Sequence, residues 1–263
     1  MPSVVDMKGR LVSIEAATAI TTEGATVSVL KLRQTLSDGR TAEEIIPETA
    51  DPQADLDPQI LLDAGSGDLL VIWSRHDGRR MTLAAARRDP SGSWSPITYL
   101  ETGKDEPAAP RAAMGVDSRI HVVWKSSPPG SEPVLRYRAY DLTTLQALGD
   151  EIGPFDRESI RAKSAPGDRG PRPSGKPAAP SSRSAPGPSS APPPAGRPAA
   201  FSAYGVEAGC DAAVVYRLAV RKLEVATLSG GKWSRGDVDL ESAPDEAAAR
   251  ALVSDIARRF CRP

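Results

Sequence analysis

Four side chains of this sequence could together bind an acidic ligand. Arg75, Lys125 and Arg217 each stand just after an apolar segment that ends on an aromatic residue, and His76 follows the first of them. Guanidinium and ammonium groups bind carboxylate or sulfate, and arginine can do so through two parallel hydrogen bonds. The pattern predicts a ligand site made of Arg75, His76, Lys125 and Arg217. Exposed hairpin loops often carry such cations without a ligand, and this alternative stays open.

The acidic residues form no recognisable catalytic set. Hydrolysis of a glycoside requires an acid and a second carboxylate, or a tyrosine nucleophile, around one sugar ring. Glu224 falls inside a predicted strand, Glu207 lies near the end of another, and Tyr204 is close to it in sequence. No spacing unites these three residues, so the sequence assigns no catalytic residue.

The histidines and cysteines do not indicate a metal centre. His76 and His121 show no ligand spacing with Cys210 or Cys261, so we expect neither a metal site nor a cofactor. The two cysteines could form a disulfide only in an oxidising compartment. We expect instead two unpaired thiols that pack as small apolar side chains.

The segments that carry the four candidate ligand-binding residues recur along the chain. Leu69–Trp73 and Ile120–Trp124 are nearly alike, their tryptophans lie 51 positions apart, and Ala213–Tyr216 is a weaker third copy. Self-similarity at about 50 residues is typical of a propeller blade of four antiparallel strands. In such a fold the residues after each second strand lie on one face, where ligands bind. We expect the four tryptophans to pack in the core.

Turn signals divide each copy into strands. The first copy gives strands at 59–63, 69–73, 81–88 and 94–100, the second at 111–116, 120–124 and 134–140 with a weak fourth near Ile152, and the third at 201–206, 212–218, 222–228 and 233–240. The N-terminal residues form a divergent unit with strands at 9–17, 25–36 and 41–46. The sequence therefore predicts an all-β, propeller-like array of about three to four four-stranded antiparallel sheets, followed by one C-terminal α-helix.

The predicted domain organisation has four parts. Residues 9–159 hold the N-terminal unit and two clear repeats, and 201–241 hold the third repeat. Between them, 160–200 is rich in proline, serine and alanine, and we predict a disordered insertion because such a segment buries too little apolar surface. Residues 242–262 begin with a capping-box signature and continue with an apolar stripe, which predicts an amphipathic helix over about 244–260.

The composition of the chain limits the classes of partner that it could bind. The formal net charge of −1 gives no field that attracts nucleic acid or anionic lipid. No apolar run reaches the roughly 18 residues of a membrane span, and the N-terminus shows no apolar signal segment. We therefore expect no nucleic-acid binding and no membrane span, and the compartment stays unknown.

The repeats resemble the blades of sialidase-like propellers, which carry BNR or Asp-box repeats. The matching pieces of the first copy are Pro58–Asp63, Leu69–Trp73, Leu83–Arg88 and Gly92–Ser95. The Asp box itself is reduced to Asp89–Trp94, and its aspartate is missing from the third copy, at Gly231–Ser234. The arginine element that precedes the repeats in that family has no counterpart. The resemblance implies a degenerate, incomplete member of a group that acts outside the cytoplasm.

Repeat architecture without a catalytic constellation predicts a non-enzymatic binding or interaction module, with an acidic glycan or a protein as its ligand. The alternative is a sialidase-like glycoside hydrolase, or a degenerate descendant of one. A third hypothesis is a scaffold that completes its ring by self-association, because three or four units are fewer than the six of the family it resembles.

Overall fold

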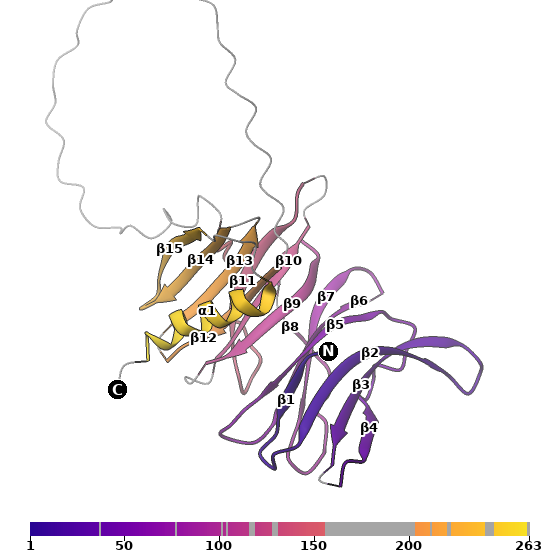
Figure 1. The fold of residues 1–263 in the computed structure, drawn as a ribbon. Coiled ribbons are helices and arrows are strands. Elements are labelled where there is room, and N and C mark those ends of the chain that lie inside the picture. Colours follow the sequence, from indigo (N-terminus) through magenta and orange to yellow (C-terminus); the bar gives the residue numbers. More distant parts are fainter. Residues whose placement is uncertain are drawn as a thin grey trace, which may run out of the picture.

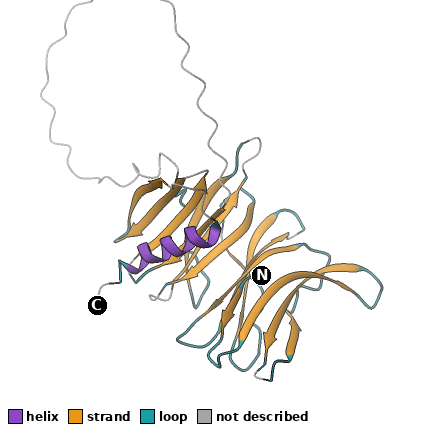
Figure 2. Ribbon diagram, in the orientation of Figure 1, coloured by secondary structure: helices purple, strands orange, loops and turns teal. Residues whose placement is uncertain are grey.

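The computed structural model describes residues 1–155, apart from 37, 77, 101, 104, 116–118 and 128–130, and residues 203–261, apart from 211, 220–221 and 240–244. The insertion predicted at 160–200 lies outside the described residues. Within them the chain forms strands β1 to β15 and the helix α1 (Figure 2).

The strands form four antiparallel sheets, each a meander in chain order (Figure 1). The first holds β1 (Ser3–Val5), β2 (Leu11–Ile20), β3 (Thr26–Thr35) and β4 (Thr41–Ile45), and the second holds β5 (Asp55–Leu62), β6 (Leu69–His76), β7 (Met81–Arg88) and β8 (Thr98–Leu100). The third holds β9 (Pro107–Met114), β10 (Arg119–Ser126) and β11 (Val134–Asp141), and the fourth holds β12 (Ala203–Ala208), β13 (Ala212–Ala219), β14 (Lys222–Ser229) and β15 (Lys232–Asp239). Helix α1 (Glu246–Arg258) follows.

This architecture confirms the predicted propeller-like all-β fold with one C-terminal helix, and it differs in two details. The N-terminal unit has a fourth strand, β1, which at three residues is too short to show an alternating pattern. In the third sheet the fourth strand is reduced to isolated bridges, Tyr140 with Ala147 and Tyr137 with Ile152. Positive φ angles at Leu145 (56°) and Gly149 (98°) interrupt the extended backbone there.

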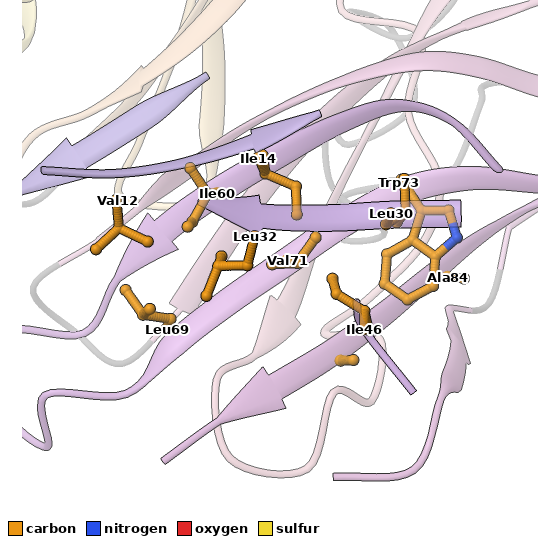
Figure 3. Close-up of a cluster of buried hydrophobic side chains, with 11 residues drawn as sticks. Val12, Ile14, Leu30, Leu32, Ile46, Ile60, Leu69, Val71, Trp73 and Ala84 are labelled. Carbon is orange, nitrogen blue, oxygen red and sulfur yellow. The ribbon is translucent and has the colours of Figure 1, made fainter. Parts of the chain in front are cut away.

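Neighbouring sheets pack face to face through three apolar seams, which we number from the N-terminus. The first seam joins the first two sheets, whose side chains interdigitate (Figure 3). The first sheet and the residue after it contribute Val12, Ile14, Leu30, Leu32 and Ile46, and the second sheet contributes Ile60, Leu69, Val71, Trp73, Ala84 and Ala86. The second seam joins the second and third sheets, and the third seam joins the third and fourth. Removal of this apolar surface from water is the main force that holds the array together.

The tryptophans occupy equivalent places in their sheets. Trp73 lies in the first seam and Trp124 in the second, so each faces the preceding sheet. Trp94 and Trp233 also face the preceding sheet, in the first and third seams. Tyr216 departs from this pattern because it packs against α1. Its assignment as the third copy of the tryptophan position is therefore wrong.

The innermost strands of the second and third sheets share a bulge that the pairing of β12 with β13 lacks. Opposite Trp73, β5 inserts an extra residue, and β9 does the same opposite Trp124. The bulged residues, Asp57 (φ 52°) and Ala109 (φ 49°), both precede a proline. Strands β12 and β13 pair without a shift. These bulges affect the side chains of β5 and β9 themselves. Tyr216 faces α1 because β13 alternates without a break and places Ala213 and Val215 on the seam side.

Helix α1 covers the outer face of the fourth sheet (Figure 1). Asp245 caps the helix by accepting a hydrogen bond from the Ala248 backbone N–H at 2.7 Å, close to the predicted start. Small residues let the helix approach closely, since a Cβ on Gly209 would stand 2.4 Å from the Ala257 carbonyl oxygen. In the part of the chain that the structure describes, no helix has the length and apolarity to cross a membrane.

Cys210 and Cys261 form a disulfide, with their Cα atoms 4.8 Å apart. The expectation of two unpaired thiols is therefore wrong. Cys210 lies in the turn between β12 and β13, and Cys261 lies just beyond α1. Docking of the helix brings the two together, although 51 positions separate them in sequence.

The outer face of the first sheet is polar. Arg33 forms ion pairs with Glu15 at 3.1 Å and with Glu43 at 2.9 Å, and Lys31 approaches Glu43 at 3.9 Å. These side chains point away from the first seam, because they alternate with the seam residues along the strands. The two end sheets thus differ: a helix covers the fourth, and a charged ladder occupies the first.

Replacement of both Cys210 and Cys261 by serine should lower the free energy of unfolding. Loss of a crosslink that closes a loop of this length corresponds to about 4 kcal/mol in the chain-entropy estimate. Urea denaturation followed by circular dichroism measures the change. Dithiothreitol should lower the midpoint of the parent protein and leave that of the double variant unaltered. Equal midpoints for parent and variant would contradict the prediction.

Candidate functional site

The candidate cations lie at the same ends of their sheets. Each is in the second strand of its sheet and pairs with one of the first two residues of the innermost strand: Arg75 with Asp55, Lys125 with Ala108 and Arg217 with Tyr204. They do not share one face. Arg75 points to the first seam, whereas Lys125 and Arg217 both point to the third. Arg75 stands two residues after Trp73, so its equivalent in the third sheet is Ser126, two residues after Trp124.

Arg75 is engaged inside the protein. Its side chain is 3% exposed, and its guanidinium donates hydrogen bonds to both carboxylate oxygens of Asp55 at 2.9 Å. It also donates to the Gln53 side chain and to Asp51. The indole N–H of Trp73 donates to Asp55 at 2.6 Å. Burial raises the pKa of Asp55 to about 6, although Arg75 and Trp73 oppose the shift.

The other candidate cations are arranged differently. The Lys125 ammonium lies 5.2 Å from the centre of the Tyr204 ring, and Arg217 lies 4.5 Å from that of Phe155. Arg217 also pairs with Glu224 across β13 and β14. His76 accepts the Gly78 backbone N–H through Nδ1 at 3.2 Å. Ligand binding by these residues stays a prediction.

A pocket of about 290 Å³ lies along the innermost strands β5, β9 and β12 and against α1. We call it the inner-strand pocket. Its polar lining comes from Gln59 of β5, Arg111 of β9, Glu207 of β12, Tyr216 of β13, and Glu246 and Arg250 of α1. Four separate sheet strands and the helix thus contribute hydrogen-bonding side chains to one cavity.

Tyr216 lies among the charged side chains of this pocket. Glu207 accepts a hydrogen bond from the Arg250 guanidinium at 2.7 Å. Burial raises the pKa of Tyr216 to about 12. Glu246 and Glu207 add to this rise, and Arg250 opposes it. The phenol therefore stays protonated at neutral pH and can donate a hydrogen bond to a ligand.

Arg111 forms the opposite wall of the pocket. Its guanidinium lies 5.7 Å from the centre of the Tyr204 ring and donates to the Pro110 carbonyl at 3.1 Å. Tyr204 itself is buried, its hydroxyl donates to the Ala109 carbonyl, and burial raises its pKa. Arg111 thus presents a cation beside the cavity, whereas Tyr204 is a packing residue.

The structure does not bring Tyr204, Glu207 and Glu224 together. Tyr204 faces the third seam, and Glu224 is paired with Arg217, so only Glu207 reaches the inner-strand pocket. Sequence reasoning missed the remaining polar lining, which consists of Gln59, Arg111, Tyr216, Glu246 and Arg250. The only sequence signal was the spacing of Glu246 and Arg250, one helical turn apart, which places both on one face of α1.

No protein-family model and no curated protein matches the sequence. Several solved structures have a similar fold. The α-L-arabinofuranosidase of Fusarium graminearum, in complex with an iminosugar inhibitor, has a TM-score of 0.50 at 13% identity, covering 92% of this chain and 64% of that chain. The α-L-arabinanase of Penicillium chrysogenum, complexed with arabinobiose, has a TM-score of 0.45 at 13% identity, with 90% and 73% covered. A levansucrase mutant of B. megaterium has a TM-score of 0.48 at 8% identity, with 92% and 68% covered.

The chain has a propeller fold that glycoside hydrolases share. It spans 64% of the length of the arabinofuranosidase. The likeness at a TM-score of 0.50 is to an arabinofuranosidase, and it does not support the narrower expectation of sialidase BNR repeats. The similar structure with the TM-score of 0.50 is a glycoside hydrolase. This finding corrects the prediction of a non-enzymatic binding module, and the glycoside hydrolase alternative is taken up below as a proposal.

Replacement of Asp55 by asparagine should destabilise the fold. The change leaves the buried Arg75 without its full counter-charge, and breaking such a pair costs about 3 kcal/mol. Urea denaturation measures the loss. The matched control is Asp38→Asn, because the pair of Asp38 with Arg40 is exposed. Equal midpoints for the two variants would show that the buried pair is not needed.

Replacement of Gly205 by alanine should displace the Tyr216 ring. A Cβ at this position would stand 2.7 Å from the Tyr216 hydroxyl and 2.8 Å from its ring. We expect a loss of about 1–3 kcal/mol in the free energy of unfolding, the usual cost of overpacking. Gly236→Ala is the control, since a Cβ there has nothing within 4 Å. A stable Gly205→Ala protein with unaltered tyrosine absorbance would contradict the packing described.

Proposed function

We propose that the protein hydrolyses glycosidic bonds in the inner-strand pocket. The observation that carries the proposal is the presence of two carboxylates, Glu207 and Glu246, in the wall of one pocket on a propeller fold. The two come from different elements, β12 and α1, and can therefore approach a bound sugar from different directions. A pair of carboxyl groups around the scissile bond is the usual requirement of this reaction.

The two carboxylates suit different tasks. Glu207 accepts a hydrogen bond from Arg250 at 2.7 Å and is thereby suited to the anionic role, as nucleophile or as the base that activates water. Glu246, the first residue of α1, is left to protonate the leaving oxygen. The hydroxyl of Tyr216, the amide of Gln59 and the guanidinium of Arg111 would orient the sugar hydroxyls. Such polar groups at fixed positions are typical of small-ligand sites.

The disulfide supports an oxidising compartment for this activity. Structural disulfides persist in extracytoplasmic settings and are rare in the cytosol. We therefore place the proposed hydrolase outside the cytoplasm, where polymeric glycans are met as substrates.

A panel of glycosides tests the proposal. Aryl arabinofuranosides, fructans and aryl sialosides cover the activities that the resemblances suggest. Replacement of Glu207 or Glu246 by glutamine should lower kcat/KM on any cleaved substrate by about 100-fold or more, because a catalytic carboxyl group is lost. Glu224→Gln is the control, since Glu224 lies outside the pocket and pairs with Arg217.

Two results would contradict the proposal. The first is turnover that survives in both glutamine variants. The second is the absence of turnover by the parent protein on all substrates of the panel.

A further inference from the structure

Helix α1 lies where a further sheet would pack in a closed ring. It buries Ala249, Val253 and Ala257 against Val214, Tyr216, Leu218, Leu223 and Val225 of the fourth sheet. Leu252 and Ile256 pack against the same cluster with part of their surface exposed. Burial of this apolar stripe stabilises the docked helix.

The N-terminal half of α1 carries the groups that reach the inner-strand pocket. Glu246 and Arg250 both line it, and the Arg250 guanidinium hydrogen-bonds to Glu207 at 2.7 Å. Glu207 is 19% exposed, and within the described part of the chain Arg250 is its one ion-pair partner. The orientation of this carboxylate therefore depends on a residue that belongs to none of the sheets.

The opposite end of α1 is held covalently. The Cys210–Cys261 bond links the residues beyond the helix to the turn between β12 and β13. Close to it, the Gly209 backbone meets the last turn of the helix at Ala257. The disulfide therefore fixes one end of α1, and the other end lies at the pocket.

We infer that Arg250 is a positioning residue for Glu207, and that the pocket is complete only while the Cys210–Cys261 bond holds α1 on the fourth sheet. The inference rests on the proposed function and names a requirement of the same site. If α1 leaves the sheet, Glu207 loses its ion pair, Glu246 leaves the pocket wall, and Tyr216 becomes exposed to water.

Arg250 variants test the positioning role. In the parent protein, on the best-cleaved substrate of the panel, Arg250→Ala should lower kcat about 10-fold or more with a smaller change in KM, because the reacting carboxylate is misplaced. Arg250→Lys should restore part of the loss, since lysine keeps the charge. Arg258→Ala is the control, because Arg258 pairs with Asp255 on the same helix, away from the pocket. Equal kcat values for all three variants would overturn the positioning role.

A Cys210→Ala, Cys261→Ala double variant tests the anchoring role without reference to catalysis. Hydrogen exchange should be at least about 10-fold faster over residues 246–258 while the strands of the first three sheets stay protected, because the opening of α1 is local. Tyrosine absorbance against pH supplies the second readout, with Tyr216→Phe in the same background identifying the signal.

Tyr216 should ionise at lower pH in the double variant. Burial raises its pKa to about 12. The carboxylates of Glu246 and Glu207 add to the rise, and the guanidinium groups of Arg250 and Arg111 oppose it. Exposure should bring it toward the ordinary value of about 10. Unchanged exchange over α1 together with an unchanged Tyr216 titration would overturn the anchoring role.

If the parent protein cleaves no glycoside, the proposed function and the positioning role of Arg250 fail. The hydrogen exchange and the tyrosine titration still decide whether the disulfide anchors α1.

Discussion

The arrangement of the strands and of the pocket follows from the face-to-face packing of neighbouring sheets. The first sheet presents one apolar face, and each later sheet packs against the sheet before it and the sheet or helix after it. The seams hold the buried aliphatic and indole side chains. This packing brings the innermost strands β5, β9 and β12 together. Groups that are distant in sequence, such as Gln59 and Glu207, therefore line one pocket. The chemistry proposed for the protein is a consequence of that convergence.

The register of each second strand decides which side chains take part. Alternation places Trp73 and Trp124 in the seams, whereas in β13 it places Val215 in the third seam and Tyr216 against α1. Tyr216 is thereby available to the pocket, where Gly205 leaves space for its ring. The polar chemistry of the fourth sheet thus follows from register as much as from composition.

The ends of the array show how an incomplete ring is kept from exposing two apolar faces. The first sheet carries the ion pairs of Arg33 and Lys31 on its outer face, and α1 covers the fourth. A closed propeller covers each sheet with the next one. Here the helix takes that place, and as it does so it brings Glu246 and Arg250 to the pocket.

The repeated antiparallel sheets and the C-terminal helix could be predicted from the residues alone, because alternation, turn residues and a helix cap are local signals. The predicted bounds of strand β7, Met81–Arg88, agree with the structure to the residue. The sequence also predicted equivalent positions for Lys125 and Arg75 and two unpaired thiols for the cysteines, and the structure corrects both. The pocket and its residues, the pairing of Cys210 with Cys261 and the burial of Arg75 became visible only in the folded chain. A strand that is apolar on both faces gives no signal of which side chain faces which neighbour, so a difference of one residue between copies goes unseen. Contacts between the innermost strands and α1 likewise depend on how separate elements pack, which no local spacing records.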